Sequence, residues 1–129
     1  MDRLAERLAI AERALETLRE IDLDGDVSPR DRDAAIIRFI YSFEAVWKAA
    51  QQILADREGV DARTPKSAIR AALDAGFLKA EETEAALIAA NDRNLAVHTY
   101  NEELAHALLT RLPAHVDVLV RWLTAMQNG

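Results

Sequence analysis

The sequence predicts an all-α fold, an antiparallel four-helix bundle with one additional short helix, in a single domain of residues 1–129. Half of the residues are hydrophobic, and only four glycines and three prolines interrupt the chain. Apolar residues recur at helical spacings of three and four, while the alternation typical of half-buried strands is absent. A chain of this length buries about 65–70% of its unfolded surface, which is enough for a core without disulfides.

The first helix is expected over about residues 2–21, where Leu4, Leu8 and Leu15 belong to a narrow apolar seam. It stops at an acidic segment, residues 22–26, that superficially resembles a calcium loop. An EF-hand needs glycine at its sixth position and glutamate at its twelfth. Val27 and Asp33 occupy those positions, so the segment is interpreted as an acidic turn.

Ser28 and Pro29 form an N-cap and first helical residue for the longest helix, which is expected to reach about Arg57. Its apolar surface is broad enough to contact several helices, or a second subunit. Trp47 is interpreted as a core residue on this helix. Glu44 and Lys48, one turn apart, are interpreted as a helix surface pair.

A loop at residues 58–62 leads to a short helix that begins at Thr64 and Pro65 and ends near Gly76. A fourth helix starts around Ala80. The last helix is expected from Thr99 or Tyr100 to about Met126, with a kink at Pro113 because proline cannot donate the backbone hydrogen bond of the preceding turn. The elements thus alternate direction, as an antiparallel bundle requires.

One short stretch concentrates the chemically versatile side chains: Arg93, Asn94, His98 and Tyr100. An arginine offers a planar cation for phosphate oxygens, and a histidine exchanges protons near neutral pH. These are the parts of a site that handles phosphodiesters.

The helical pattern lapses between Ala90 and Glu102, so this stretch is expected at a helix junction. Thr99 and Glu102 have the spacing of a capping box, which would place His98 just outside the N-terminus of the last helix and Tyr100 in its first turn. The partial positive charge of that N-terminus would then favour an anion.

Other kinds of site are poorly supported. His98 and His106 are eight residues apart with no carboxylate cluster, so no metal site is predicted, and no cofactor. His106 and His115 are interpreted as helix surface or boundary residues. Serine and cysteine nucleophile constellations and phosphate-cradling glycine loops are missing.

Charge and composition limit the partners. The chain has 16 basic and 22 acidic residues, a net charge of −6, which argues against a broad nucleic-acid surface. Cysteine is absent, and neither a signal peptide nor a membrane-spanning stretch is recognised, so a cytoplasmic location without membrane contact is expected.

The motif Arg93-Asn94, with His98 and Tyr100 at their spacing, resembles the signature of HEPN proteins. It is most similar to the HepT-type group, also called nucleotidyltransferase-substrate-binding proteins. The segment Phe43–Lys48 resembles that group's phenylalanine-glutamate and tryptophan-lysine segment on an early helix. The group often has a tryptophan two turns before the motif arginine, whereas residues 85–88 are Ala-Ala-Leu-Ile here, interpreted as a packing change.

The resemblance implies a HEPN-like homodimer with a composite cleft, acting as a ribonuclease toxin on RNA, possible targets including tRNA. In its metal-independent cleavage, His98 would transfer protons, Arg93 would stabilise phosphate charge, and Asn94 would orient His98 or a phosphate oxygen. The cognate partner would be a minimal nucleotidyltransferase antitoxin that silences the toxin by AMPylation of Tyr100. The resemblance also raises the chance that Glu44 or Lys48 supports the site.

Two alternatives stay open from the sequence. In the first alternative to the ribonuclease, the chain is a non-catalytic subunit that binds a substrate or nucleotide for the nucleotidyltransferase. In the second, it is a bundle used only for assembly. The acidic net charge favours these two, and the pairing of Arg93 with His98 favours the ribonuclease.

Overall fold

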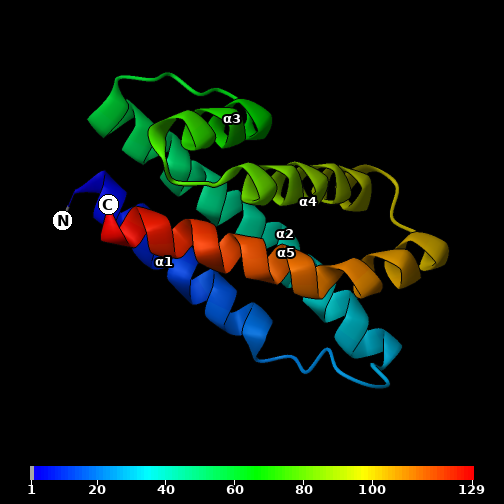
Figure 1. The fold of residues 1–129 in the computed structure, drawn as a ribbon. Coiled ribbons are helices and arrows are strands. Elements are labelled where there is room, and N and C mark those ends of the chain that lie inside the picture. Colours follow the sequence, from blue (N-terminus) through cyan, green and yellow to red (C-terminus); the bar gives the residue numbers. More distant parts are fainter. Residues whose placement is uncertain (1) are drawn as a thin grey trace.

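A computed structural model describes residues 2–129, which form five α-helices, one π-helical turn and no strand. The helices are α1 (Arg3–Arg19), α2 (Pro29–Ile53), α3 (Pro65–Ala75), α4 (Ala80–His98) and α5 (Glu102–Asn128), with the turn η1 (Leu54–Glu58) continuing α2. Figure 1 shows four long helices lying alongside one another and the short α3 beside the start of α4. This confirms the predicted helical bundle with one additional short helix.

Local sequence signals determine where several helices begin and end. The Ser28 hydroxyl accepts from the backbone N–H of Asp31 at the start of α2, and Thr64 and Ser67 form a capping box at the start of α3. Gly76 follows α3 with a φ of 87°, a left-handed conformation that costs glycine little. The predicted caps at Ser28 and Thr64 are therefore confirmed.

Helix α2 is the central element of the core and contacts α1, α3, α4 and α5. Phe39 and Phe43 on α2 are fully buried, as is Trp122 on α5, and Trp47 is 8% exposed. Burial of such side chains contributes about 1.5–3 kcal/mol each, so the broad apolar surface of α2 holds the bundle together. The interpretation of Trp47 as a core residue is confirmed.

The junction between α4 and α5 differs from the sequence expectation. The helical pattern does not lapse after Ala90, because α4 continues through His98. The N-cap of α5 is Asn101, whose side chain accepts from the backbone N–H of Leu104 at 2.8 Å. The predicted capping box of Thr99 and Glu102 is wrong, because Glu102 forms an ion pair with α2 instead.

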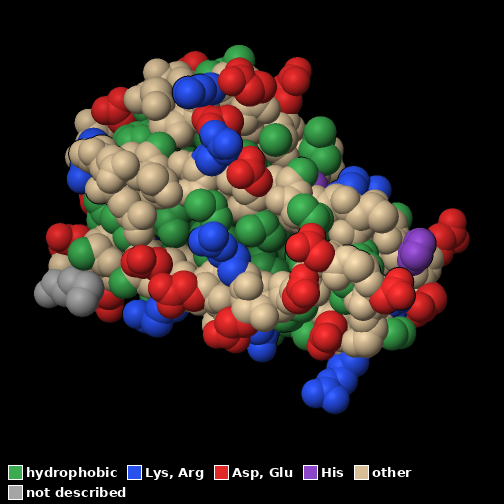
Figure 2. Space-filling model, turned by 60° about the horizontal axis from the view of Figure 1, so that its bottom comes forward, with side chains coloured by type: hydrophobic (Ala, Val, Ile, Leu, Met, Phe, Trp, Pro, Cys, Tyr) green, Lys and Arg blue, Asp and Glu red, His purple; other side chains and the backbone are tan. Residues whose placement is uncertain are grey.

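Helix α5 continues on both sides of Pro113, and the kink expected there stays a prediction. Within residues 2–129, none of the helices is both long and apolar enough to cross a membrane. On the face shown in Figure 2, acidic and basic side chains are interspersed with hydrophobic ones. This face has no continuous basic surface of the kind that wraps nucleic acid.

Candidate functional site

Arg93 is held against α2 by two different contacts. Its Nη2 atom lies 2.5 Å from Oε2 of Glu44, and its guanidinium lies over the ring of Phe43, 5.7 Å from the ring centroid. The side chain is 21% exposed, so part of the guanidinium faces solvent. An ion pair and a cation–π contact together fix a cation that stays accessible to an anion.

Glu44 connects the two segments that carried the sequence resemblance. Its carboxylate contacts Arg93 and also lies 3.5 Å from Nζ of Lys48. Burial raises the pKa of the Glu44 carboxyl, but the hydrogen bond and charge of Arg93, with the charge of Lys48, outweigh burial and lower the pKa below its ordinary value. Glu44 therefore supports the arginine directly, while Lys48 reaches it only through Glu44.

Asn94 is hydrogen-bonded to Arg93 and lines a depression together with His98. Nη1 of Arg93 donates to Oδ1 of Asn94 at 2.8 Å. Asn94 and His98, one helical turn apart, line the same shallow depression on α4 with Asn91, Leu95 and Thr99. Arg93 and His98 project about 140° apart around the helix axis at 100° per residue. The structure thus brings the three predicted residues to the end of α4, with a hydrogen bond between Arg93 and Asn94 and one depression lined by Asn94 and His98.

His98 is exposed at the C-terminal end of α4. The predicted position of His98 beside a helix N-terminus is wrong, because α4 extends further than expected. A helix C-terminus favours a cation, so the helix dipole does not attract an anion to His98. The partly exposed guanidinium of Arg93 is a cation on this surface.

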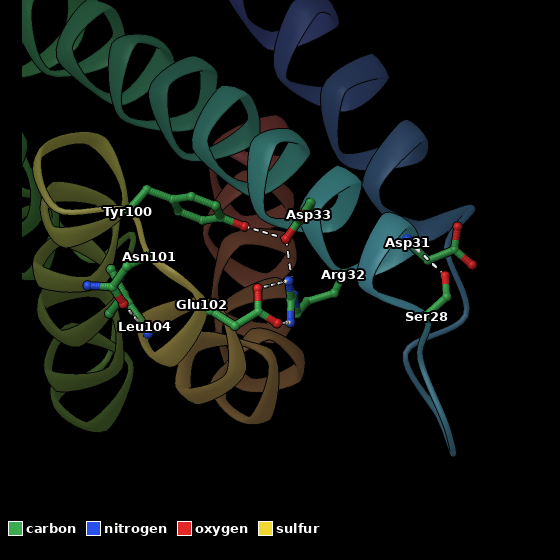
Figure 3. Close-up of polar contacts among 8 residues, drawn as sticks. All are labelled: Ser28, Asp31, Arg32, Asp33, Tyr100, Asn101, Glu102 and Leu104. Carbon is green, nitrogen blue, oxygen red and sulfur yellow. Dashed lines mark hydrogen bonds and ion pairs between the residues drawn. The ribbon is translucent and has the colours of Figure 1, made fainter.

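Tyr100 lies in the linker between α4 and α5 rather than in the first turn of α5 (Figure 3). Its hydroxyl donates to Oδ1 of Asp33 at 2.5 Å, and the residue is 47% exposed. Burial and the hydrogen bond to Asp33 raise the pKa of Tyr100 to about 12. The phenol is therefore protonated at neutral pH and directed at a carboxylate.

Arg32 completes the cluster around Tyr100, and sequence reasoning missed it. The residue is 6% exposed, and its Nε donates to Oδ1 of Asp33 at 3.0 Å. Its Nη1 and Nη2 donate to the two carboxylate oxygens of Glu102 at 2.7 and 3.0 Å. One sequence signal existed: a buried cation in the first turn of α2 opposes the helix dipole and so needs anionic partners.

A third polar cluster is buried between α4 and α5. Asp92 accepts two hydrogen bonds from Arg111, at 2.7 and 2.9 Å, and lies 2.6 Å from Nε2 of His115. The ring of His115 stacks on Phe39 with centroids 5.2 Å apart, and the residue is 2% exposed. The interpretation of His115 as a surface or boundary residue is wrong, because it occupies a core position of α5.

The carboxyl of Asp92 and the imidazole of His115 both have pKa values below their ordinary values. Burial raises the pKa of Asp92, but the hydrogen bonds from Arg111 and His115 outweigh it and lower the pKa below the usual aspartate value. Burial lowers the pKa of His115, and this exceeds the opposite effect of Asp92. The result is an ionised Asp92 paired with Arg111 and a neutral His115 that donates to it.

Comparison with known proteins identifies the class of the fold and site. Residues 6–128 match the family described as nucleotidyltransferase substrate binding protein like. The chain belongs to this family, which confirms the sequence resemblance. Among curated proteins, none matches the chain.

Several solved structures are similar, and three of them are the following. A crystal structure of a protein from Thermus thermophilus has 47% identity and a TM-score of 0.85, covering 91% of this chain and 98% of that chain. The tri-AMPylated Shewanella oneidensis HEPN toxin, in complex with MNT antitoxin, has 15% identity and a TM-score of 0.81, with both chains fully covered. A mutant toxin–antitoxin MntA-HpeT complex has 15% identity and a TM-score of 0.79, with 98% of each chain covered. At 15% identity, the last two show that the fold is that of HEPN toxins.

Proposed function

We propose that this chain is a HepT-like HEPN ribonuclease toxin, which cleaves RNA without a metal ion and is controlled by a cognate minimal nucleotidyltransferase in the cytoplasm. The observation that carries the proposal is the grouping of Arg93, Asn94 and His98 at the end of α4. A fixed, partly exposed cation is hydrogen-bonded to Asn94, and Asn94 lines one depression with an exposed imidazole. Charge stabilisation and proton transfer are the two functions that phosphodiester cleavage by a ribose hydroxyl needs.

Arg93 has donors available for a phosphate. Of the five N–H groups of a guanidinium, one on Nη1 serves Asn94 and one on Nη2 serves Glu44. The others have no partner among residues 2–129. They would bind non-bridging oxygens as negative charge grows on the phosphate, while His98 removes the 2′-hydroxyl proton or protonates the leaving 5′-oxygen.

A homodimer would complete this site. One copy offers one imidazole, whereas cleavage needs a base and an acid, so a two-fold axis near the end of α4 would supply both from identical chains. Large apolar side chains are exposed on the helices that surround Arg93, including Ile37 and Tyr41 on α2 and Leu95 and Val97 on α4. A second copy of the chain would cover them.

The dimer has its own test. Val97→Glu should place a charge in the interface, convert a dimer to a monomer in light scattering, and abolish cleavage. Leu73→Glu is the control, because Leu73 on α3 is similarly exposed at 39% but lies away from the motif. A parent protein that is monomeric at micromolar concentration would refute the composite cleft.

The partner assignment rests on the family, whose description names nucleotidyltransferases, and on two structural neighbours that are toxin–antitoxin complexes. The Shewanella toxin is AMPylated. In this chain we propose Tyr100 as the AMP acceptor, because it occupies the tyrosine position of the motif, two residues after His98, and its phenol is partly exposed. An AMP there would bring a phosphate and an adenosine toward the cation that substrate RNA needs.

The deciding experiment is RNA degradation, with tRNA among the substrates, by purified protein in the presence of a chelator. His98→Ala should slow cleavage by about a hundredfold or more, because a proton-transfer group is lost. His106→Ala is the matched control on α5. Equal cleavage by His98→Ala and the parent would favour the alternative, a non-catalytic subunit that binds substrate or nucleotide for the nucleotidyltransferase.

A further inference from the structure

The hydroxyl of Tyr100 is already hydrogen-bonded to a carboxylate before any modification. We propose that Asp33 is the proton acceptor for nucleotidyl transfer to Tyr100, holding the phenol in position and taking its proton when the oxygen attacks. This inference rests on the proposed function, in which Tyr100 receives AMP from ATP held by the partner enzyme. It adds a catalytic residue contributed by the toxin itself.

The geometry places the proton on a direct route. The Tyr100 hydroxyl lies 2.5 Å from Oδ1 of Asp33, and Figure 3 shows the two side chains directed at each other from the linker and the start of α2. In the reaction, a bond forms between the Tyr100 oxygen and the α-phosphorus of ATP. The bond from that phosphorus to the β-phosphate oxygen breaks, pyrophosphate leaves, and the phenol proton passes to Asp33 and then to solvent.

The timing of the proton transfer follows from the acidities. A phenol with a pKa of about 12 does not give up its proton to a carboxylate in the resting protein. As the new phosphorus–oxygen bond forms, the phenol oxygen becomes strongly acidic, and the carboxylate within hydrogen-bond distance then accepts the proton. Asp33 therefore acts as a general base in the transition state rather than by making a phenolate beforehand.

Arg32 keeps Asp33 ready for this role. It donates to the same carboxylate from its Nε, and its two Nη atoms are held by Glu102 at the start of α5. The hydrogen bonds from Tyr100 and Arg32 lower the pKa of Asp33. The carboxylate is therefore ionised at neutral pH, and its position is fixed by a buried guanidinium that spans two helices.

The contact between Tyr100 and Asp33 ends with the reaction. Once the proton is replaced by a phosphodiester, the hydroxyl no longer donates, and a carboxylate 2.5 Å from that oxygen would face a new negative charge. The modified side chain must turn away from Asp33. Tyrosine has one acceptor oxygen, so any further AMP unit attaches to the preceding unit, and Asp33 is needed for the first addition only.

The test compares Asp33→Asn with Asp31→Asn in transfer assays with the cognate nucleotidyltransferase and ATP. Asparagine keeps the shape of Asp33 and an oxygen that accepts the Tyr100 hydrogen bond, but it does not take up the proton. Asp31→Asn makes the same charge change in the same helical turn, and Figure 3 shows Asp31 turned away from Tyr100. Thermal melting checks that both variants fold.

Asp33→Asn should lower the maximal rate of the first AMP addition by about a hundredfold, with little change in KM for the toxin, while Asp31→Asn behaves as the parent. Intact-mass spectra of Asp33→Asn should show unmodified chains beside fully extended ones. An Asp33→Asn rate equal to that of Asp31→Asn would overturn the inference and leave the proposed control intact. No AMP on the parent, or equal AMP on Tyr100→Phe, would overturn both.

Discussion

Asp92 and Arg93 are consecutive in the sequence, yet their side chains leave α4 toward different neighbours. Asp92 is 4% exposed and meets Arg111 and His115 on α5, whereas Arg93 meets Glu44 on α2 and keeps part of its side chain in solvent. A step of 100° per residue is enough to separate them. The same helix therefore carries one ion pair built on a buried carboxylate and another at a partly exposed surface.

The two clusters also differ in how completely their hydrogen-bonding groups are used. The carboxylate of Asp92 accepts from a guanidinium and an imidazole and has no room for another molecule. The guanidinium of Arg93 retains donors beyond those used by Glu44 and Asn94. Substitution of Asp92 should therefore affect mainly folding, and substitution of Arg93 should affect mainly activity.

The largest effect is expected from Asp92→Ala, which would leave a buried imidazole and a guanidinium without their partner. We expect the free energy of unfolding to fall by about 2–3 kcal/mol, because the buried imidazole loses its acceptor, whereas the guanidinium, whose side chain is 41% exposed, can still reach solvent. This corresponds to a drop of about 10 °C in Tm. Thermal and urea unfolding give the measurement.

Asp117→Ala is the control for Asp92→Ala. Asp117 also pairs with an arginine on α5, at 3.0 Å from Arg121, but both side chains are more than half exposed. Its removal should cost less than about 1 kcal/mol, as for other surface ion pairs. Equal losses of unfolding free energy in Asp92→Ala and Asp117→Ala would mean that burial does not determine how much each aspartate contributes to stability.

Arg93→Ala is expected to have a smaller effect on folding and a large one on cleavage. Loss of the cation–π contact and of the partly exposed ion pair should lower the free energy of unfolding by about 1 kcal/mol. This is more than the roughly 0.5 kcal/mol or less expected for an arginine that lies outside the apolar stripes of the helices. RNA cleavage should fall by about a hundredfold or more, because a transition-state charge partner is removed. Arg70→Ala, at an exposed position on α3, is the control; a cleavage rate like that control's would make Arg93 structural.

Periodicity and capping residues predicted most of the fold, but not the polar clusters. The stripes and the caps at Ser28 and Thr64 are properties of local sequence and could be read directly. Glu102 was interpreted as a capping residue because local spacing does not show which distant residue it meets, here Arg32 on α2. Ion pairs between helices depend on how the helices pack.

His115 shows that a signal can be present and overlooked. It continues the spacing of Leu108, Leu112 and Leu119 on α5, all fully buried, so its position alone indicated burial. Arg93, Asn94 and His98 could be grouped from the sequence because they lie close together on one helix, and their role as a site stays a prediction. Its connection to Glu44 required the packing of α4 on α2.

The buried cluster should also make stability depend on pH. The pKa of His115 is lower in the folded chain than its ordinary value of 6.5, so the unfolded chain binds a proton first as pH falls. The stability present above pH 6.5 is therefore lost progressively below it, at no more than about 1.4 kcal/mol per pH unit. Urea unfolding at about pH 7.5 and 5.5, on either side of that value, measures this slope.

His115→Gln is expected to be less stable than the parent at about pH 7.5 but to show a flatter dependence on pH. His106→Gln, on the exposed side of α5, should keep the parent's dependence of stability on pH, because His115 is unchanged. A parent protein that is more stable in the acidic buffer than in the neutral one would mean that His115 is charged in the fold. Asp92 would add a further loss only in stronger acid, since its pKa lies below 3.8.

The smallest effect is expected from Glu44→Gln, which separates the two consequences of the contact with Arg93. Glutamine keeps the shape but loses the charge, so the guanidinium is less firmly fixed while more of its positive charge is available to RNA. KM should decrease and kcat should decrease by about tenfold, because ground-state attraction improves and orientation for the transition state is lost.

Lys48→Gln is the control. It changes a charge one turn away that does not touch Arg93, and it should leave kcat unaltered. Steady-state cleavage of a short RNA measures both KM and kcat. The free energy of unfolding should change by less than about 1 kcal/mol. If kcat is unchanged while KM alone moves, Glu44 only tunes the charge of the site, and Arg93 owes its orientation to Phe43 and Asn94.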